Sequence, residues 1–139
     1  MPYTDPVVGA GWSPPGINYD TGALLTYAAA SAGTNGADQI NSVGRGVKVV
    51  VNITAITGTT PTFTVTIQGK DSASGAYFTL LASAALNATG TTVLTVYPGL
   101  TAAANVTVND VLPRTWRVIT AIGGSTPAVT ATVGASVIH

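Results

Sequence analysis

Apolar and polar residues alternate along most of the last two-thirds of the chain. Residues 47–55 carry Val, Val, Val, Ile and Ala at every second position, and residues 62–69 place Phe63, Val65 and Ile67 opposite three threonines and a glutamine. A period of two predicts half-buried β-strands, because successive side chains of a strand point to opposite faces. Further strands are predicted at residues 77–83, 91–97, 106–108, 115–122 and 128–137.

One stretch of the chain occurs twice. Residues 53–69 (ITAITGTTPTFTVTIQG) and residues 119–135 (ITAIGGSTPAVTATVGA) align without gaps at an offset of 66, and nine of the seventeen positions are identical. Each copy has an apolar run, a Gly/Thr/Pro segment and a second alternating run, which predicts a β-hairpin that is used twice.

The strands are short and are separated by turn signals, which predicts an all-β fold. A β-sandwich of jelly-roll or immunoglobulin-like type, or a small barrel, fits this spacing, and duplicated hairpins favour a sandwich with an internal pseudo-two-fold axis. The alternation of apolar residues before the repeat differs between the two copies: Trp116 and Val118 fall on the face that Val50 and Asn52 occupy in the first copy. Either a bulge shifts the phase or both faces of that strand are covered.

The first 44 residues differ from the remainder, so we expect an extended N-terminal arm (residues 1–44) and a β-sandwich body (residues 45–139). The arm holds four prolines and shows no sustained periodicity. Residues 23–32 (ALLTYAAASA) are compatible with a short helix, although Thr26 and Tyr27 disfavour it. The arm also carries aromatic and aliphatic residues, which favours an arm laid across its own body or across a neighbour.

The chain has very few charges. Five basic and five acidic residues give a net charge of zero, and charged residues make up 7% of the sequence, against about 25% in typical soluble domains. Such a surface gives no attraction toward nucleic acid or an anionic membrane. Two interpretations remain open: a threonine-rich domain kept soluble by its hydroxyl groups, or a subunit whose surface is largely covered by neighbours.

Residues with catalytic or metal-binding chemistry are scarce. The chain has no Cys and no Glu, its only His is His139, and its five Asp residues are scattered. Neither a nucleophile–His–acid arrangement, a carboxylate pair nor a clustered metal site is indicated. We therefore expect no enzyme activity, no cofactor and no metal. The N-terminal sequence also predicts no signal peptide, and no run is long and apolar enough for a transmembrane helix.

Aromatic and arginine residues are the candidates for binding. Trp12, Tyr19 and Trp116 are able to stack on sugars if they are exposed; the alternative places Trp116 in the core and makes Trp12 an anchor of the arm. Arg114 and Arg117 flank Trp116, and an Arg beside an aromatic is a frequent interface anchor. The residues that we expect at an interface are Trp12, Tyr19, Leu24, Leu25, Tyr27, Arg114, Trp116 and Arg117.

The part from residue 47 to residue 138 resembles small structural proteins of tailed bacteriophages. The resemblance is carried by VNITAITGTTPTFTVTIQGKD and by LPRTWRVITAIGGSTPAVTATVGAS, after a Gly/Pro-rich arm. It implies a virion component on a β-sandwich or β-tulip fold: a capsid decoration (cement) protein, or a tail or baseplate subunit. It supplies no binding motif whose residues are transferable to this chain.

If the resemblance holds, the protein is a non-enzymatic subunit on the capsid surface, made in the host cytoplasm. Its partners would be the major capsid protein and copies of itself, and the expected assembly is a homotrimer. We expect binding to neither nucleic acid nor membrane. A carbohydrate-binding module is the alternative from another functional class.

Overall fold

A computed structural model describes residues 19–139, with side chains from residue 21 onward. This part of the chain is all-β and contains no helix. Its strands are β1 (Tyr19–Ala30), β2 (Gln39–Ile40), β3 (Gly46–Lys70), β4 (Tyr77–Ala82), β5 (Gly90–Val96), β6 (Thr107–Val108) and β7 (Thr115–Ile138). They form one mixed sheet in the order β1-β7-β3-β5-β6, with β2 added to β7 and β4 added to β3. Only the β5–β6 pair is parallel among the described strands.

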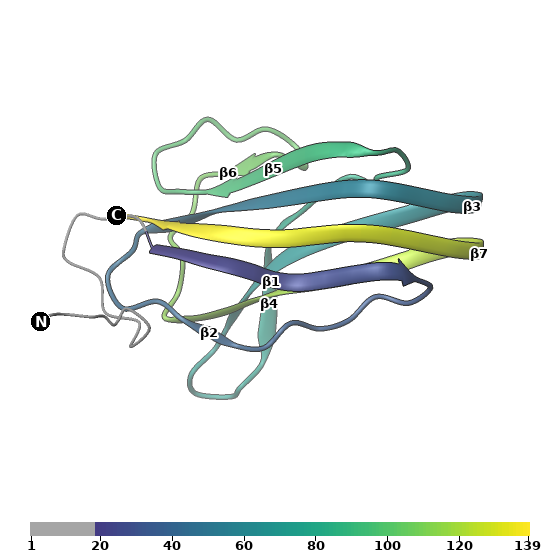
Figure 1. Cartoon of the computed structure of the whole chain (residues 1–139). Coiled ribbons are helices and arrows are strands. Elements are labelled where there is room, and N and C mark those ends of the chain that lie inside the picture. Colours follow the sequence, from purple (N-terminus) through teal and green to yellow (C-terminus); the bar gives the residue numbers. More distant parts are fainter. Residues whose placement is uncertain (1–18) are drawn as a thin grey trace, which may run out of the picture.

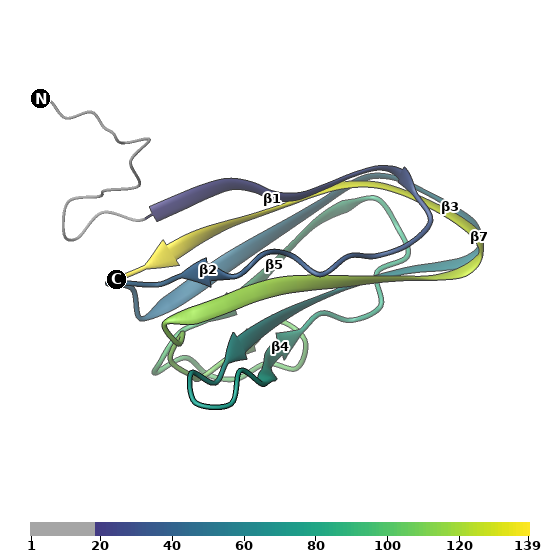
Figure 2. The ribbon, with the colours of Figure 1, turned by 90° about the horizontal axis from the view of Figure 1, so that it is seen from below.

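Two very long strands, β3 and β7, form the backbone of the sheet. They pair antiparallel from Gly46↔Ile138 to Gly69↔Trp116. Figures 1 and 2 show both strands turning together at one end, at the right of each view, so that the sheet folds over itself. Half A contains residues 46–56 of β3 and 128–138 of β7, with β1, β5 and β6. Half B contains residues 62–70 and 115–123, with β2 and β4.

The core lies between the two halves and is built from the alternating apolar positions. Tyr27 on β1 of half A packs edge-on against Phe63 of half B, with ring centroids 5.4 Å apart. The Tyr27 hydroxyl also shares hydrogen bonds with the hydroxyls of Thr34 (2.9 Å) and Thr120. The largest fully buried side chains are Trp116, Phe63, Ile67, Leu94, Val47, Val49, Val51, Val65, Val96, Val118 and Val129. The predicted period of two is therefore confirmed in β3 and β7.

The repeated stretch does not form two separate hairpins. Each copy runs through its Gly/Thr/Pro segment as part of one continuous strand, β3 or β7, and the two copies pair with each other. The Gly/Thr/Pro segments bend these strands instead of reversing them. The prediction of a hairpin within each copy was therefore wrong. The chain bends at the Gly/Thr/Pro segment but does not reverse direction there, so the two arms of one copy do not pair with each other.

The two copies are related by an approximate two-fold axis at the bend. When each residue is replaced by its counterpart 66 positions away, one β3–β7 pair becomes another. The pair Ala55↔Thr130 becomes Thr64↔Ala121, and the pair Thr59↔Ser125 becomes itself. Backbone conformation follows the same symmetry, since φ is +123° at Gly58 and +107° at Gly124, and +47° at Thr60 and +46° at Thr126.

A bulge explains the phase inconsistency between the copies. Ile53 pairs with Ala131 and Ala55 with Thr130, so Thr54 is an extra residue in β3. No equivalent shift occurs at Thr120, which pairs with Val65. Ile53 is consequently buried in the first copy, whereas Thr120 is buried in the second. Of the two alternatives, the bulge is the one observed.

The N-terminal region is more regular than its sequence indicated. The short helix with which residues 23–32 are compatible does not form: residues 19–30 form β1, paired with β7 through three register shifts. Its alanines and leucines lie along an edge strand, where tertiary pairing overrides helix propensity. Residues 34–41 follow the first part of β7, along the same edge as β1, through the Thr120→Thr34 and Gly36→Val118 backbone hydrogen bonds of 2.9 and 2.8 Å. The second part of the expected arm is thus part of the sheet.

Candidate functional site

Two loops are tied together at the end of the molecule opposite the bend. They contain residues 41–45 and residues 109–114. Asn41 is 9% exposed; its side-chain amide donates to the carbonyls of Gly44 (2.8 Å) and Leu112 (3.1 Å) and accepts from the Gly44 N–H (2.8 Å). Backbone bonds from Asn41 N–H to Arg114 (2.6 Å) and from Leu112 N–H to Arg45 (2.8 Å) complete the connection. A buried, fully paired amide fixes the relative position of both loops.

These loops and the adjoining β2 expose apolar side chains and arginines together. Ile40, Val43 and Val111 are 56%, 60% and 55% exposed, and Arg45 and Arg114 are also exposed. We call these five residues the end surface. Exposed apolar patches that are rimmed by polar residues mark interaction sites in many proteins.

A second group of exposed valines lies on half A. Val50 on β3 and Val93 on β5 are cross-strand partners, 37% and 38% exposed, on the face that points away from the core. We call these two residues the valine surface. Val50 is five residues beyond Arg45, roughly 16 Å along the strand, so the two surfaces are separate.

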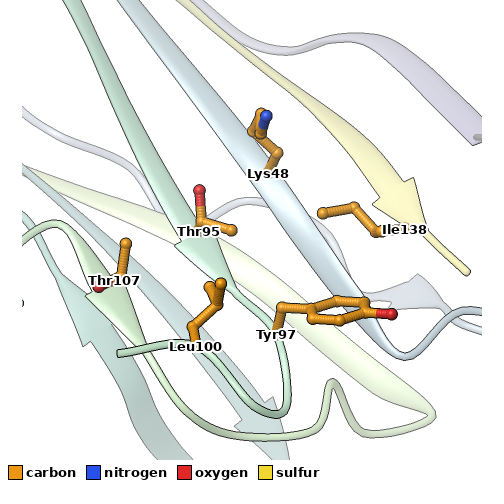
Figure 3. Close-up of a pocket in the computed structure, with 6 residues that line it drawn as sticks. All are labelled: Lys48, Thr95, Tyr97, Leu100, Thr107 and Ile138. Atoms are coloured by element: carbon orange, nitrogen blue, oxygen red, sulfur yellow. The ribbon is translucent and has the colours of Figure 1, made fainter. Parts of the chain in front are cut away.

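A shallow hollow of about 360 Å³ adjoins the valine surface (Figure 3). Its lining side chains come from β3, β5, β6, the segment after β5 and the end of β7: Lys48, Thr95, Tyr97, Leu100, Thr107 and Ile138. The Tyr97 hydroxyl donates to the His139 carbonyl at 3.1 Å. The remaining polar groups are one ammonium and two threonine hydroxyls. This is a recess in the outer face, and its chemistry does not define a particular ligand.

A row of polar side chains crosses the outer face of half B. The Asp38 carboxylate accepts hydrogen bonds from Lys70 Nζ (2.9 Å) and from the Tyr77 hydroxyl (2.7 Å). The Arg117 guanidinium lies 3.4 Å from the centre of the Tyr77 ring, and its Nε donates to Gln68 at 2.9 Å. The row connects the segment before β2 with β3, β4 and β7, so its side chains are engaged in holding strands together.

Hydrogen bonds set the acidity of two carboxylates in this region. The Tyr77 hydroxyl, followed by Lys70, lowers the pKa of Asp38 below its ordinary value of 3.8. The Ser74 hydroxyl, followed by the Ser74 and Ala73 backbone N–H groups, lowers the pKa of Asp71. Both shifts stabilise the ionised form of a carboxylate that acts as an acceptor, and both carboxylates have structural partners.

The residues expected at an interface are distributed over different environments. Tyr27 and Trp116 are core residues at 5% and 1% exposure, so neither is available to a partner. Leu24 and Leu25 are partly buried against the core. Arg114 is exposed on the end surface, whereas Arg117 is half-buried over Tyr77.

Two expected residues are not characterised by side-chain geometry. Trp12 lies outside the described residues, and Tyr19 pairs with Val137 through its backbone at the start of β1. Stacking of Trp116 on a sugar is excluded by its burial. The core placement, which was the other interpretation of Trp116, is the one observed.

Sequence reasoning missed most of the end surface. The signal was present in two short segments, NSVGRG at residues 41–46 and NDVLPR at residues 109–114, each with an aliphatic residue among turn-forming residues and an arginine. A single apolar residue in a turn has no period, so pattern analysis did not select it. The loops come together only through the pairing of β2 and β3 with β7.

Comparisons with known proteins do not assign the chain to a family. No family model, curated protein or solved structure matches it. Within residues 19–139, no group of three or more His, Cys, Asp or Glu side chains is positioned to hold a metal ion. The same part of the structure contains no helix with the length and hydropathy that crossing a membrane requires.

Proposed function

We propose that this protein is a structural virion subunit that decorates a bacteriophage capsid and stabilises it by bridging neighbouring capsid subunits. The observation that carries the proposal is the presence of two separate groups of exposed apolar side chains on one continuous sheet: the end surface and the valine surface. A subunit with two such surfaces is able to contact two neighbours at once. The bacteriophage setting comes from the resemblance of residues 47–138.

The shape of the fold supports a bridging role. We propose that the folded-over sheet is equivalent to a β-sandwich, because β3 and β7 each contribute residues to both halves. Twenty paired positions between these strands, from Gly46 to Gly69 of β3, make the body continuous from the bend to the opposite end. Continuous strands transmit the position of one contact surface to the other, which a shell-stabilising subunit requires.

The surface composition also supports assembly. Proteins with a net charge near zero tend to associate, and this chain has no net charge and few charged residues. The proposed partners are the major capsid protein and copies of the chain itself, as a homotrimer. In such an assembly the neutral surface with its exposed valines becomes buried. This burial stabilises the assembly by about 25 cal/mol per Å² of apolar area removed from water.

The test is cosedimentation with shells of the same virus that lack the protein, combined with light scattering of the free protein. We expect the wild type to have the mass of three chains and to pellet with shells. A Val43→Ser/Val111→Ser variant and a Val50→Thr/Val93→Thr variant should each pellet less. Binding to tails in place of shells would move the assignment to a tail or baseplate subunit, and binding to neither would overturn it.

Any deletion of the arm should end at residue 18. Removal of residues 1–44 would also remove β1 and β2, which pair with β7, so a loss of binding would then report unfolding. A chain that starts at residue 19 keeps every described strand. Its binding to shells measures the contribution of residues 1–18 alone.

A further inference from the structure

We infer that the end surface binds a protein surface on which carboxylates surround apolar side chains. This inference rests on the proposed function and specifies the partner of one of its two surfaces. The end surface has loops of fixed geometry, arginines without an ion-pair partner among the described residues, and exposed aliphatic side chains.

The loops of the end surface are held in position before any partner arrives. The side-chain amide of Asn41 makes three hydrogen bonds, and the backbones of Arg45 and Arg114 each accept one from the opposite loop. Gly44 packs closely, because a Cβ added there would lie 2.1 Å from Val137. A surface that is already ordered loses little conformational entropy on binding.

The positive charge of the end surface is not neutralised within the described residues. Neither Arg45 nor Arg114 has an ion-pair partner there, whereas Lys70 is paired with Asp38. Asp110, in the same loop as Arg114, uses one carboxylate oxygen to accept the Val111 N–H at 2.7 Å. The end surface itself therefore contains two guanidinium groups and no carboxylate, on a charge-poor chain. Guanidinium forks match carboxylates geometrically.

The aliphatic residues narrow the choice of partner further. Ile40, Val43 and Val111 are more than half exposed, and burial of such side chains requires an apolar counterpart. A nucleic acid would present phosphates without that counterpart, and two arginines provide only a small share of a typical phosphate interface. A second copy of the same surface would oppose arginines to arginines, since both charged residues of the surface are cations.

Binding of random copolymers tests the inference without an identified partner. The probes are a glutamate–tyrosine copolymer, polyglutamate and a lysine–tyrosine copolymer, immobilised for surface plasmon resonance with the full-length protein. We expect measurable binding to the glutamate–tyrosine copolymer, weaker binding to polyglutamate and none to the lysine–tyrosine copolymer. Ionic strength near 1 M, where the Debye length is about 3 Å, should weaken the binding.

Three variants locate the binding. Arg45→Gln/Arg114→Gln and, independently, Val43→Ser/Val111→Ser should each reduce affinity for the glutamate–tyrosine copolymer at least about tenfold. Lys48→Gln is the matched control, because Lys48 is another exposed cation that lies outside the end surface, and it should bind as the wild type does. Unfolding curves establish that all three variants are folded.

Several results would overturn the inference. They are equal binding by the arginine variant and the wild type, preference for the lysine–tyrosine copolymer, and tighter binding to DNA or anionic vesicles than to the acidic copolymer. If the Arg45→Gln/Arg114→Gln variant self-associates more strongly than the wild type, the occupant of the end surface is a second copy of the chain. Shell binding by the wild type that the arginine variant retains in full would overturn the inference and leave the proposed function standing. Copolymer binding without shell binding would do the reverse.

Discussion

At the scale of single residues, Trp116 combines nearly complete burial with an unpaired polar atom. Its side chain is 1% exposed, and its indole nitrogen has no hydrogen-bond partner among the residues that the structure describes. A buried donor without a partner costs free energy, so this side chain stabilises the fold through its apolar area and its packing.

Trp116→Phe should therefore destabilise the protein much less than Trp116→Ala. Phenylalanine removes the unpaired N–H and retains an aromatic ring, so we expect a loss of about 1–2 kcal/mol in the free energy of unfolding. Alanine leaves a cavity and should cost about 3–5 kcal/mol. Urea unfolding followed by circular dichroism measures both values. A Phe variant that is as unstable as the Ala variant would show that the indole nitrogen has a stabilising partner.

The Asp38 carboxylate should titrate below its ordinary pKa of 3.8. Because folding lowers this pKa, the ionised carboxylate stabilises the folded state above the ordinary value, and that contribution disappears as the pH falls through the lowered pKa. Carboxyl-carbon NMR measures the midpoint. In Tyr77→Phe the midpoint should rise, since the strongest hydrogen bond is lost, whereas Asp71, which is bonded to Ser74, should not change. An unshifted Asp38 in the wild type would contradict the hydrogen-bond geometry.

At the scale of elements, the bend of β3 and β7 depends on two glycines related by the repeat. Gly58 and Gly124 have φ values that side chains rarely adopt, +123° and +107°. A Cβ at Gly58 would lie 2.9 Å from Pro127 Cα, and one at Gly124 would lie 2.9 Å from Pro61 Cα. Each glycine thus allows the other copy to approach, and the bend is built from the same sequence twice.

Gly58→Ala and Gly124→Ala should destabilise the fold to a similar extent. Each combines an unfavourable φ with crowding against backbone atoms, so we expect a loss of about 2–4 kcal/mol. Gly90→Ala is the matched control: its φ is +142°, but nothing lies within 4 Å of an added Cβ. The control should lose about 1 kcal/mol. Chemical denaturation compares the three, and equal losses at Gly58 and Gly90 would show that crowding at the bend is unimportant.

At the scale of the whole molecule, the fold depends on contacts between residues far apart in the sequence. The first residue of β3 pairs with the last residue of β7, Gly46 with Ile138, and β1 pairs with the same C-terminal part of β7. The ends of the long intervening chain must be brought together before these pairs form, and this loop-closure entropy slows folding.

Folding should accordingly take milliseconds to seconds, as is typical of all-β domains with non-local pairing. The chain has two tryptophans. Stopped-flow fluorescence of a Trp12→Phe variant therefore follows the burial of Trp116 alone. Folding within microseconds would contradict the dominance of the β3–β7 pairing.

The sequence by itself determined the all-β class, the positions of most strands and the scarcity of charge. These features follow from local alternation and composition: β4, β5 and β6 lie within a residue or two of the predicted ranges. Pattern analysis also identified the repeat and the phase inconsistency between its copies, although it left a bulge and a doubly covered strand as alternatives; the structure places the bulge at Thr54.

Only the tertiary structure decided which strands pair and which surfaces form. Strand alternation describes the two faces of one strand and contains no information about its partner. The copies of the repeat therefore looked like two hairpins, although they pair with each other. Residues 23–32 were compatible with a short helix, whereas β7 supplies hydrogen-bond partners that make residues 19–30 a strand. The end surface likewise unites loops about seventy residues apart, because backbone pairing through β7, and not any local pattern, brings them together.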